Sequence, residues 1–280
     1  MTSKMKFGLI GHPIEHSLSP ALFKAGYDGR YPYDLIQTAE FEEAYSRFLE
    51  EYDGINVTAP FKELAIKKAD ILSEECQAIG ATNLLVKTPE GIKAYNSDYL
   101  GVRLWIKMVS DGLKSVLPPW PQGEGPSTKS WEGFFSKHQI PCVLIVGIGG
   151  AGKAAAEAAR SLGCDVILMN RTLYNNEIRP LSGFREAFKA ADIIIYNLPV
   201  RLPELDQLTH EDFIDGKPKH ILEANYRNPS FDKGLIETLK AINPQTEYTG
   251  GETWLLLQAL TGYEIFTGEK PDLEKMTACL

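Results

Sequence analysis

Short apolar runs alternate with segments of helical period in the N-terminal part of the chain. The apolar runs predict strands at 7–10, 33–37 and 54–57, and the segments between them predict helices at 20–27, 41–51 and 62–71. Two further runs, 84–86 and 92–95, are separated by a Pro- and Gly-containing turn and predict a hairpin at one edge of the sheet. This alternation indicates an α/β domain.

A second alternating region follows a long stretch of different character. Its apolar runs predict strands at 142–146, 164–169, 192–196 and 220–224, with helices at 152–162, 182–190 and 231–241. Residues 109–140 are rich in Pro, Gly and polar residues and predict an irregular connection, with a short helix at 131–137. The last segment, 250–266, predicts a helix that we expect to return to the first domain. Two sheets indicate two domains.

The glycine-rich segment at 147–153 lies between a predicted buried strand and an Ala-rich helix. Gly147 permits a tight turn, Gly149 lets the backbone approach a pyrophosphate, and Gly152 lets the helix pack on the strand. The phosphates would lie against the free N–H groups of the helix start. The same residues nearly match a nucleoside-triphosphate loop, but Ala154 stands where that loop needs a magnesium-binding hydroxyl. The segment therefore predicts a dinucleotide site.

The end of the next strand, Asn170-Arg171-Thr172, indicates which dinucleotide binds. No carboxylate stands there to accept from the ribose hydroxyls of NAD, whereas Arg171 can pair with a 2′-phosphate and its two neighbours can donate to it. This favours NADP. The alternative is a solvated strand end in which Thr172 caps the next turn.

Composition and charge narrow the possible partners. The 280 residues carry a net charge of −8 and a pI near 5.3, which argues against a nucleic acid or an anionic membrane as partner. Four cysteines show no metal-ligand spacing, so we expect no metal and free thiols in a reducing compartment. The N-terminus has no apolar core of a signal peptide, and no run approaches a membrane span. We expect a cytoplasmic protein.

Polar residues gather where strands of the first domain should end. Ser17 and Ser19 precede a predicted helix, where they could bind a carboxylate, although Ser19 as a helix N-cap followed by Pro would explain the pattern equally. Lys62 follows a strand end and could be an ordinary surface lysine. Asp98, taken alone, is a plausible N-cap of the helix running to Met108.

Together these motifs resemble shikimate dehydrogenases from Phe7 to about Gly268, with a gap at the irregular connection. The matching segments are Gly-x-Pro-x-x-His-Ser-x-Ser-Pro at 11–20, Asn-Val-Thr-x-Pro-x-Lys at 56–62, Gly-Ala-x-Asn at 80–83, Asn-x-Asp-x-x-Gly at 96–101, the glycine loop, Asn-Arg-Thr, and Gln258-Ala. The resemblance implies a discontinuous N-terminal α/β substrate domain (1–108 and 250–280) and a Rossmann-type doubly wound NADP-binding domain (141–249).

The resemblance also implies an activity: reversible NADP-dependent reduction of 3-dehydroshikimate to shikimate, by a monomer or homodimer. Lys62 and Asp98 would be the catalytic pair. The implied substrate-binding residues are Ser17, Ser19, Thr58, Asn83, Asp98, Tyr226 and Gln258. The implied cofactor-binding residues are Gly147, Gly149, Gly150, Ala151, Gly152, Asn170, Arg171, Thr172 and Gly251. We assign the proton transfer to Lys62 and the orientation of its amine to Asp98, although the sequence alone leaves this division open.

The chain departs from the usual family pattern at several positions. Ser97 stands where a threonine is usual, and Leu84 replaces another threonine after Asn83. Asn175 replaces a basic residue that would give a second contact to the 2′-phosphate. Asn197-Leu-Pro-Val replaces a small hydroxyl-bearing run, and Glu223 replaces an aspartate. These changes bear on cofactor affinity more than on substrate.

Two other functions stay open on the sequence. One is a quinate or aminoshikimate dehydrogenase of the same fold. The other is a non-catalytic ligand sensor, which would be expected to lose Lys62 or Asp98, and both are present.

Overall fold

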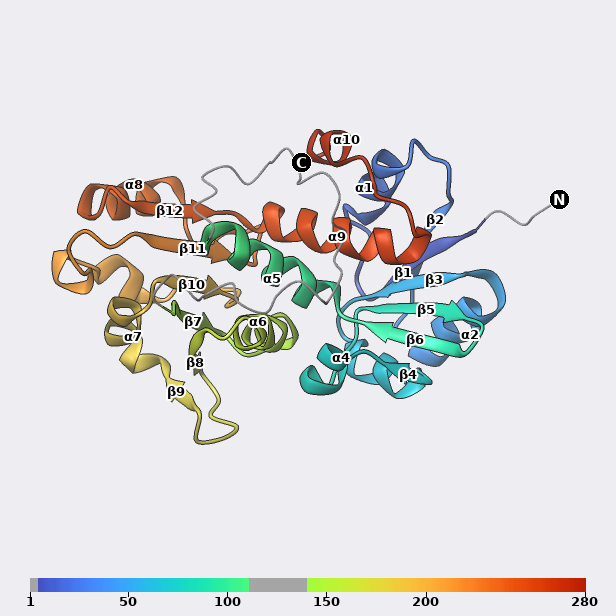
Figure 1. Cartoon of the computed structure of the whole chain (residues 1–280), viewed down its shortest axis with the longest axis horizontal. Helices are drawn as coiled ribbons and strands as arrows, with labels where there is room; N and C mark the ends of the chain where they lie inside the picture. Colours follow the sequence, from blue (N-terminus) through green and yellow to red (C-terminus); the bar gives the residue numbers. More distant parts are fainter. Residues whose placement is uncertain (1–4, 111–139) are drawn as a thin grey trace. The chain divides into compact units, whose positions relative to one another are not determined.

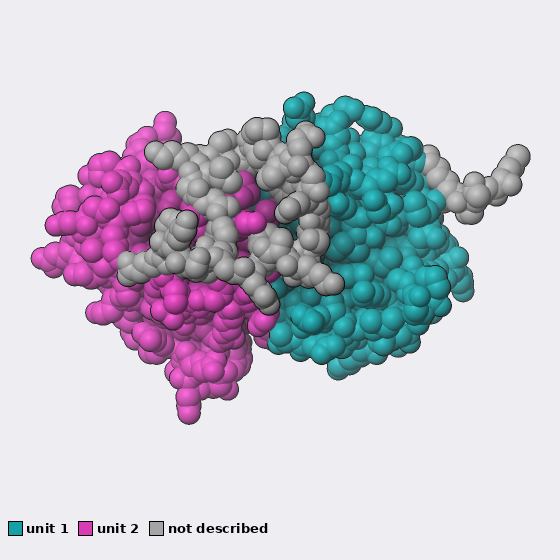
Figure 2. Space-filling view, in the orientation of Figure 1, with its two compact units in different colours: residues 1–101, 255–280 teal, residues 102–254 magenta. Residues whose placement is uncertain are grey.

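The computed structural model describes residues 5–110 and 140–280 (Figure 1). The predicted irregular connection and its helix at 131–137 lie outside the described residues, except at the margins of the connection. The chain divides into two compact units, one of residues 1–101 and 255–280 and one of residues 102–254 (Figure 2). The domain boundaries predicted from the sequence, at 108 and 250, remain a proposal.

The first unit contains a mixed six-stranded sheet in the order β2-β1-β3-β5-β6-β4. Its strands are β1 (Phe7–Gly11), β2 (Tyr33–Gln37), β3 (Gly54–Val57), β4 (Ile71–Leu72), β5 (Leu84–Thr88) and β6 (Gly91–Tyr95). β1 pairs in parallel with β2 and β3, while β5 is antiparallel to β3 and β6. The predicted hairpin β5–β6 therefore exists, but the short strand β4 forms the sheet edge that the hairpin was predicted to occupy.

The helices of this unit differ from the prediction mainly after β3. They are α1 (Ser19–Gly26), α2 (Phe41–Glu51), α3 (Lys62–Ala65) with the 3₁₀ turn η1 (Ile66–Lys68), α4 (Glu74–Ile79), the first turn of α5 (Ser97–Ser110), α9 (Gly251–Thr267) from Leu255 onward, and α10 (Leu273–Thr277). The predicted helix 62–71 is wrong at its end, because Asp70 N donates to Ile92 O at 2.8 Å and the next residues pair with β6.

The C-terminal segment completes the core of the first unit. The ring of Phe266 in α9 stacks on that of Phe7 in β1, with centroids 4.8 Å apart, and Tyr263 meets Phe23 edge-on at 4.7 Å. The Tyr263 hydroxyl donates to Ser19 O at 3.0 Å. Aromatic pairs of this kind add to the apolar burial, so α9 is an integral part of this core.

The second unit contains six strands in the order β12-β11-β10-β7-β8-β9, and every pair is parallel. They are β7 (Cys142–Val146), β8 (Asp165–Asn170), β9 (Ile178–Pro180), β10 (Ile193–Tyr196), β11 (Lys219–Glu223) and β12 (Thr246–Thr249). The helices are α6 (Gly150–Ser161), α7 (Phe184–Ala190) and α8 (Lys233–Ile242), together with α5 from Val102 onward and the start of α9 up to Trp254. The 3₁₀ turns are η2 (Leu181–Gly183), η3 (Pro203–Gln207) and η4 (His210–Asp212). The chain moves outward from β7 to β9 and then returns to β10 (Figure 1). This is the doubly wound order, with its switch point between β7 and β10.

A buried lysine holds the end of one helix in this unit. Lys219 in β11 is 2% exposed, and its Nζ donates to the carbonyl oxygens of Phe188, Lys189 and Ala191 at the C-terminus of α7. These carbonyls lack partners within the helix, so the ammonium group supplies their hydrogen bonds.

Two further features bear on the predictions made from composition. All four cysteines are free thiols, as predicted; Cys76 and Cys164 are buried, and burial raises the pKa of each to about 11. Among residues 5–110 and 140–280, no helix is both long enough and apolar enough to cross a membrane.

Candidate active site

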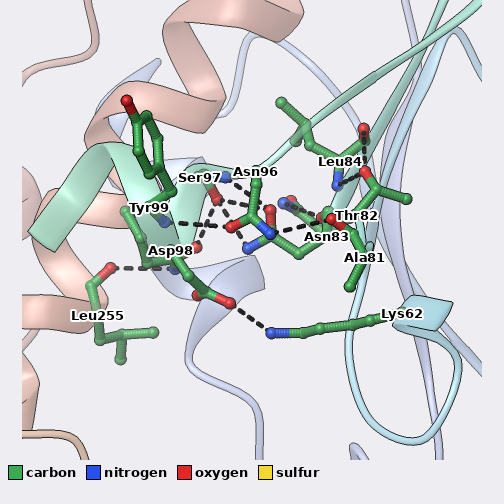
Figure 3. Close-up of polar contacts among 12 residues, drawn as sticks. Lys62, Ala81, Thr82, Asn83, Leu84, Asn96, Ser97, Asp98, Tyr99 and Leu255 are labelled. Carbon is green, nitrogen blue, oxygen red and sulfur yellow. Dashed lines mark hydrogen bonds and ion pairs between the residues drawn. The ribbon is translucent and has the colours of Figure 1, made fainter. Parts of the chain in front are cut away.

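The start of α5 is set by Asn96, which immediately precedes the helix. Its Oδ1 accepts from Tyr99 N at 3.1 Å, and its Nδ2 donates to Ala81 O at 3.2 Å. Asn96 is therefore the side chain that caps α5. The interpretation of Asp98 as N-cap is wrong: Asp98 lies in the first turn, where its carboxylate is directed away from the helix start (Figure 3).

Asp98 instead pairs with Lys62. Lys62 is the first residue of α3, and its Nζ donates to Asp98 Oδ2 in a short, direct contact (Figure 3). The two side chains are 21% and 16% exposed, so the ammonium and carboxylate are largely withdrawn from solvent yet still reachable. Thr82 N donates to Lys62 O at 3.2 Å and ties the base of the lysine to the loop before β5. Lys62 is thus not an ordinary solvated surface lysine.

Asn83 and Gln258 meet through a buried serine. Asn83 Oδ1 accepts from Ser97 N at 2.7 Å, and Asn83 Nδ2 donates to Ser97 Oγ at 3.0 Å. The Ser97 hydroxyl also lies 3.0 Å from Gln258 Oε1. Residues from the β5 loop, α5 and α9 are therefore joined in one network, beside the Lys62–Asp98 pair (Figure 3).

The two serines before α1 are joined to each other. Ser19 N donates to Ser17 Oγ at 3.2 Å, and the two hydroxyls are also 3.2 Å apart. Ser19 is the first helical residue and Leu18 precedes it, so the prediction that Ser19 is the N-cap is wrong. Ser17 occupies that role in part, because it accepts from a first-turn N–H.

Thr58 follows β3, next to the end of β1. Its backbone N donates to Ile10 O at 2.9 Å. A Cβ at Gly11 would lie 2.3 Å from Thr58 Cγ2, so the absence of a side chain at Gly11 makes room for this threonine. The ends of β1 and β3 therefore fix the position of the Thr58 backbone.

The glycine loop after β7 has the shape that a phosphate site requires. Gly147 has a φ of +91°, and a Cβ at Gly152 would lie 1.9 Å from Gly147 O, so both positions require glycine. Gly149 has open space around its missing Cβ and caps α6 with no side-chain hydrogen bond. The first N–H groups of α6, at Gly150, Ala151 and Gly152, have no partner within the helix, and a helix start of this kind can bind an anion.

The loop after β10 faces the glycine loop across the switch point. A Cβ at Gly147 would lie 3.0 Å from Leu198 Cδ2 and 3.1 Å from the backbone carbon of Asn197. Asn197 Oδ1 is buried and has no hydrogen-bond partner within the described part of the chain. A buried polar atom at this place is consistent with a polar ligand at the switch point.

Asn170 links the glycine loop to the end of β8. Its Oδ1 accepts from Ile148 N at 3.3 Å and its Nδ2 donates to Thr172 O at 3.0 Å. Arg171 and Thr172 are exposed, whereas Asn175 Oδ1 accepts from Glu177 N at 3.0 Å in a local turn. Asn170 therefore shapes the loop, and Arg171 is the charged residue that the loop presents.

Glu223 holds the loop after β11 in place through hydrogen bonds, a role that was not predicted from the sequence. It is fully buried, accepts from Phe231 N at 3.3 Å and from Tyr248 Oη at 2.8 Å, and makes a further short contact with Ser230 N. Burial and the Glu223 carboxylate raise the pKa of Tyr248, so its phenol remains a donor. Glu223 thus anchors the loop that follows β11. Any effect of Glu223 on cofactor affinity, which the sequence predicts, would be transmitted by that loop.

That loop carries Tyr226 and touches the start of α9. A Cβ at Gly251 would lie 2.7 Å from Ala224 O and 2.8 Å from Tyr226 N, so only glycine permits this close approach. The Arg227 guanidinium lies over the Tyr226 ring, 5.7 Å from its centroid.

The fold and these loops define a two-domain α/β protein whose second domain is of the Rossmann-like NAD(P)-binding type. The sequence profile of the shikimate dehydrogenase substrate binding domain matches residues 9–85. A second profile, the NAD binding domain of D-isomer specific 2-hydroxyacid dehydrogenases, matches residues 128–223. The chain belongs to the shikimate dehydrogenase family.

Individual relatives agree with this assignment. The chain is 32% identical to a shikimate dehydrogenase (NADP⁺) of Thermotoga maritima over 73% of its length, and 34% identical to the bifunctional 3-dehydroquinate dehydratase/shikimate dehydrogenase of Arabidopsis thaliana over 94%. The matches cover 63% and 44% of these relatives, so the chain spans less than two thirds of either. The crystal structure of shikimate 5-dehydrogenase from Thermus thermophilus with NADP(H) and shikimate is similar over 98% of both chains, with 26% identity and a TM-score of 0.71.

Proposed function

We propose that the protein is an NADP-dependent oxidoreductase that reversibly reduces 3-dehydroshikimate to shikimate. The observation that carries this proposal is the Lys62–Asp98 pair: a direct, partly buried contact between a proton donor and a carboxylate, in the unit that matches the substrate-binding profile. Relatives at 32% and 34% identity are named for the same activity.

Bound NADP(H) would supply or accept the hydride. The protein must then move one proton to or from the carbonyl oxygen that becomes the hydroxyl. Lys62 is suited to this step, because its Nζ carries exchangeable protons in a site that restricts solvent. Asp98 would hold that amine in one orientation and accept from a substrate hydroxyl with its remaining lone pairs. We therefore give Lys62 the proton transfer and Asp98 the positioning.

The remaining residues of the first unit would bind the substrate. We propose that Ser17 and Ser19 hold its carboxylate with hydroxyl and backbone donors at the start of α1, and that Thr58, Asn83 and Gln258 contact its ring hydroxyls. Tyr226 joins this set on the family resemblance alone.

The cofactor would be held mainly by the second unit. The N–H groups at Gly150, Ala151 and Gly152 suit its pyrophosphate, and the room left by Gly147 and Gly149 lets it approach. Asn170, Arg171 and Thr172 would contact the 2′-phosphate, and the backbone of Gly251 would face the nicotinamide carboxamide. We further propose a cytoplasmic monomer or homodimer without nucleic-acid or membrane partners, on the net charge of −8 and the free thiols.

The test is oxidation of NADPH by the purified protein with 3-dehydroshikimate, followed at the nicotinamide absorbance. Parallel reactions with NADH and with 3-dehydroquinate measure the preference for cofactor and substrate. We expect turnover with 3-dehydroshikimate and NADPH to exceed both. Faster turnover of 3-dehydroquinate would make the protein a quinate dehydrogenase, and binding without turnover would make it a sensor.

A further inference from the structure

Ser97 occupies a position from which one hydroxyl reaches two amide side chains. It is the first residue of α5 and is fully buried. Its Oγ lies 3.0 Å from Asn83 Nδ2, 3.0 Å from Gln258 Oε1 and 3.3 Å from Asn83 Oδ1. A hydroxyl has one proton to donate and two lone pairs with which to accept. The amide nitrogen of Asn83 can only donate, so the Ser97 hydroxyl accepts a hydrogen bond from it. The hydroxyl then donates its own hydrogen bond to Gln258 Oε1.

The orientation of Asn83 follows from its two contacts. Its Oδ1 accepts from Ser97 N at 2.7 Å, an N–H that has no partner within the helix because it belongs to the first turn. Its Nδ2 donates one hydrogen to Ser97 Oγ. The second hydrogen on Nδ2 has no acceptor in the part of the chain that the structure describes. This remaining N–H of Asn83 is a donor that it can offer to a ligand oxygen.

The orientation of Gln258 follows in the same way. Its Oε1 accepts from Ser97, and its Nε2 donates to Leu255 O at 3.1 Å, one turn back along α9. One hydrogen on Nε2 is left over among the described residues. Gln258, too, offers an N–H.

We propose that Ser97 is a positioning residue that fixes the polarity of both amides, so that Asn83 and Gln258 each present an N–H donor and recognise ligand oxygens acting as acceptors. This inference rests on the proposed function for the identity of the ligand. It assigns Ser97 no direct contact with the ligand and no part in proton transfer, because Ser97 is fully buried and its one proton is already donated to Gln258. The serine would act on ligand affinity alone.

The first experiment removes the hydroxyl. Ser97→Ala leaves Asn83 Nδ2 without its acceptor and Gln258 Oε1 without its donor, so both amides can rotate. We expect KM and the equilibrium Kd for shikimate to rise about tenfold, the loss of one net hydrogen-bond energy at each amide. We expect kcat, its pH profile and KM for NADPH to stay within about threefold, since these depend on other groups. Ser97→Thr keeps the hydroxyl and should restore the parent KM.

Thr261→Val is the matched control. Thr261 in α9 is buried, and among the described residues its hydroxyl donates only to carbonyl oxygens of its own helix, 3.1 Å from Leu257 O and 3.2 Å from Gln258 O. It should lower thermal stability about as much as Ser97→Ala and leave KM for shikimate unchanged. An equal rise in KM in both variants would show a purely structural role for Ser97 and overturn the proposal.

The second experiment tests the polarity directly. Gln258→Glu keeps an oxygen that can accept from Ser97 but replaces the N–H with a second acceptor. If the amide donates to the ligand, this variant should bind shikimate at least tenfold more weakly, no better than Gln258→Ala. Retained affinity in Gln258→Glu would mean that the ligand donates to this position, and the proposal would fail. A parent protein that neither binds nor turns over shikimate would overturn the proposed function together with this inference, whereas an active parent with an unaffected Ser97→Ala would overturn this inference alone.

Discussion

The candidate site in the first unit is built from side chains, whereas the one in the second unit is built from backbone. Around Lys62 the groups that matter are an amine, a carboxylate, two amides and a hydroxyl, each oriented by another side chain or a backbone group. Around Gly147 the important feature is the absence of side chains, which exposes the N–H groups of α6. The first site should therefore be sensitive to changes of chemistry, and the second to changes of shape.

The largest effect is expected from Lys62→Ala, which removes a functional group from the first site. We expect kcat to fall by about 10²–10⁴-fold while Kd for shikimate stays close to the parent value, because the amine acts where the proton moves. Steady-state kinetics and equilibrium binding measure the two quantities. If the variant kept more than half of the parent turnover, Lys62 would have no place in the mechanism.

Two alanine substitutions in the glycine loop separate shape from ligand contact in the second site. Gly152→Ala places a methyl group 1.9 Å from Gly147 O, so it should lower the free energy of unfolding by about 3 kcal/mol or more and abolish NADPH binding. Gly149→Ala adds its methyl group in open space, so its thermal midpoint should match the parent while Kd for NADPH rises. Thermal unfolding and fluorescence titration distinguish them. Equal unfolding temperatures for both variants would contradict the steric argument.

Arg171→Ala tests the part of the second site that does depend on a side chain. An Arg–phosphate contact is worth about 1.5–3 kcal/mol, or roughly ten- to a hundredfold in Kd. Because Asn175 supplies no second cation, KM for NADPH should rise by about that factor and KM for NADH should hardly change. Asn175→Ala is the control, since its side chain makes only a local turn. Equal weakening of both cofactors would mean that Arg171 contacts a part that they share.

The smallest effect concerns stability alone. Lys219→Met keeps an unbranched side chain of similar length but leaves carbonyl oxygens at the end of α7 without a donor, at a cost of about 1–3 kcal/mol. We expect a lower denaturation midpoint with an unchanged KM for NADPH, measured in urea and by steady-state kinetics. A raised KM would show that support at the end of α7 reaches the glycine loop.

The periodicity of apolar residues predicted the longer helices and strands, but it did not predict the shortest ones. Strands β2, β3 and β7 have the predicted bounds, and β3 and β7 are buried over most or all of their length. The two-residue strand β4, the three-residue β9 and the helix α4 have too few residues to establish a period. β4 is defined by pairing with β6, which is a tertiary contact.

The chemical residues were easier to predict than the residues that orient them. Lys62 and Asp98 were both singled out from the sequence, and the structure brings them into contact. The capping roles were misassigned, because Asn96, Ser97 and Asp98 are adjacent and propensity ranks such residues almost equally. Likewise, nothing local in the sequence joins Ser97 to Gln258, which is 161 positions away.

The route of the chain through its two units has a consequence for synthesis of the protein on the ribosome. The second unit is continuous in sequence, but the first is interrupted and receives its aromatic partners, Tyr263 and Phe266, only from α9. The stacking partner of Phe7 is therefore synthesised only near the end of translation. In contrast, each strand of the second unit can pair as soon as it is synthesised. Chains stalled at Trp254 should resist protease in the second unit while the first is still cleaved. The N-terminal segment, which is synthesised first, is therefore stabilised last. Until α9 has been synthesised, the apolar residues of this segment lack their partners, and the nascent chain is prone to aggregation.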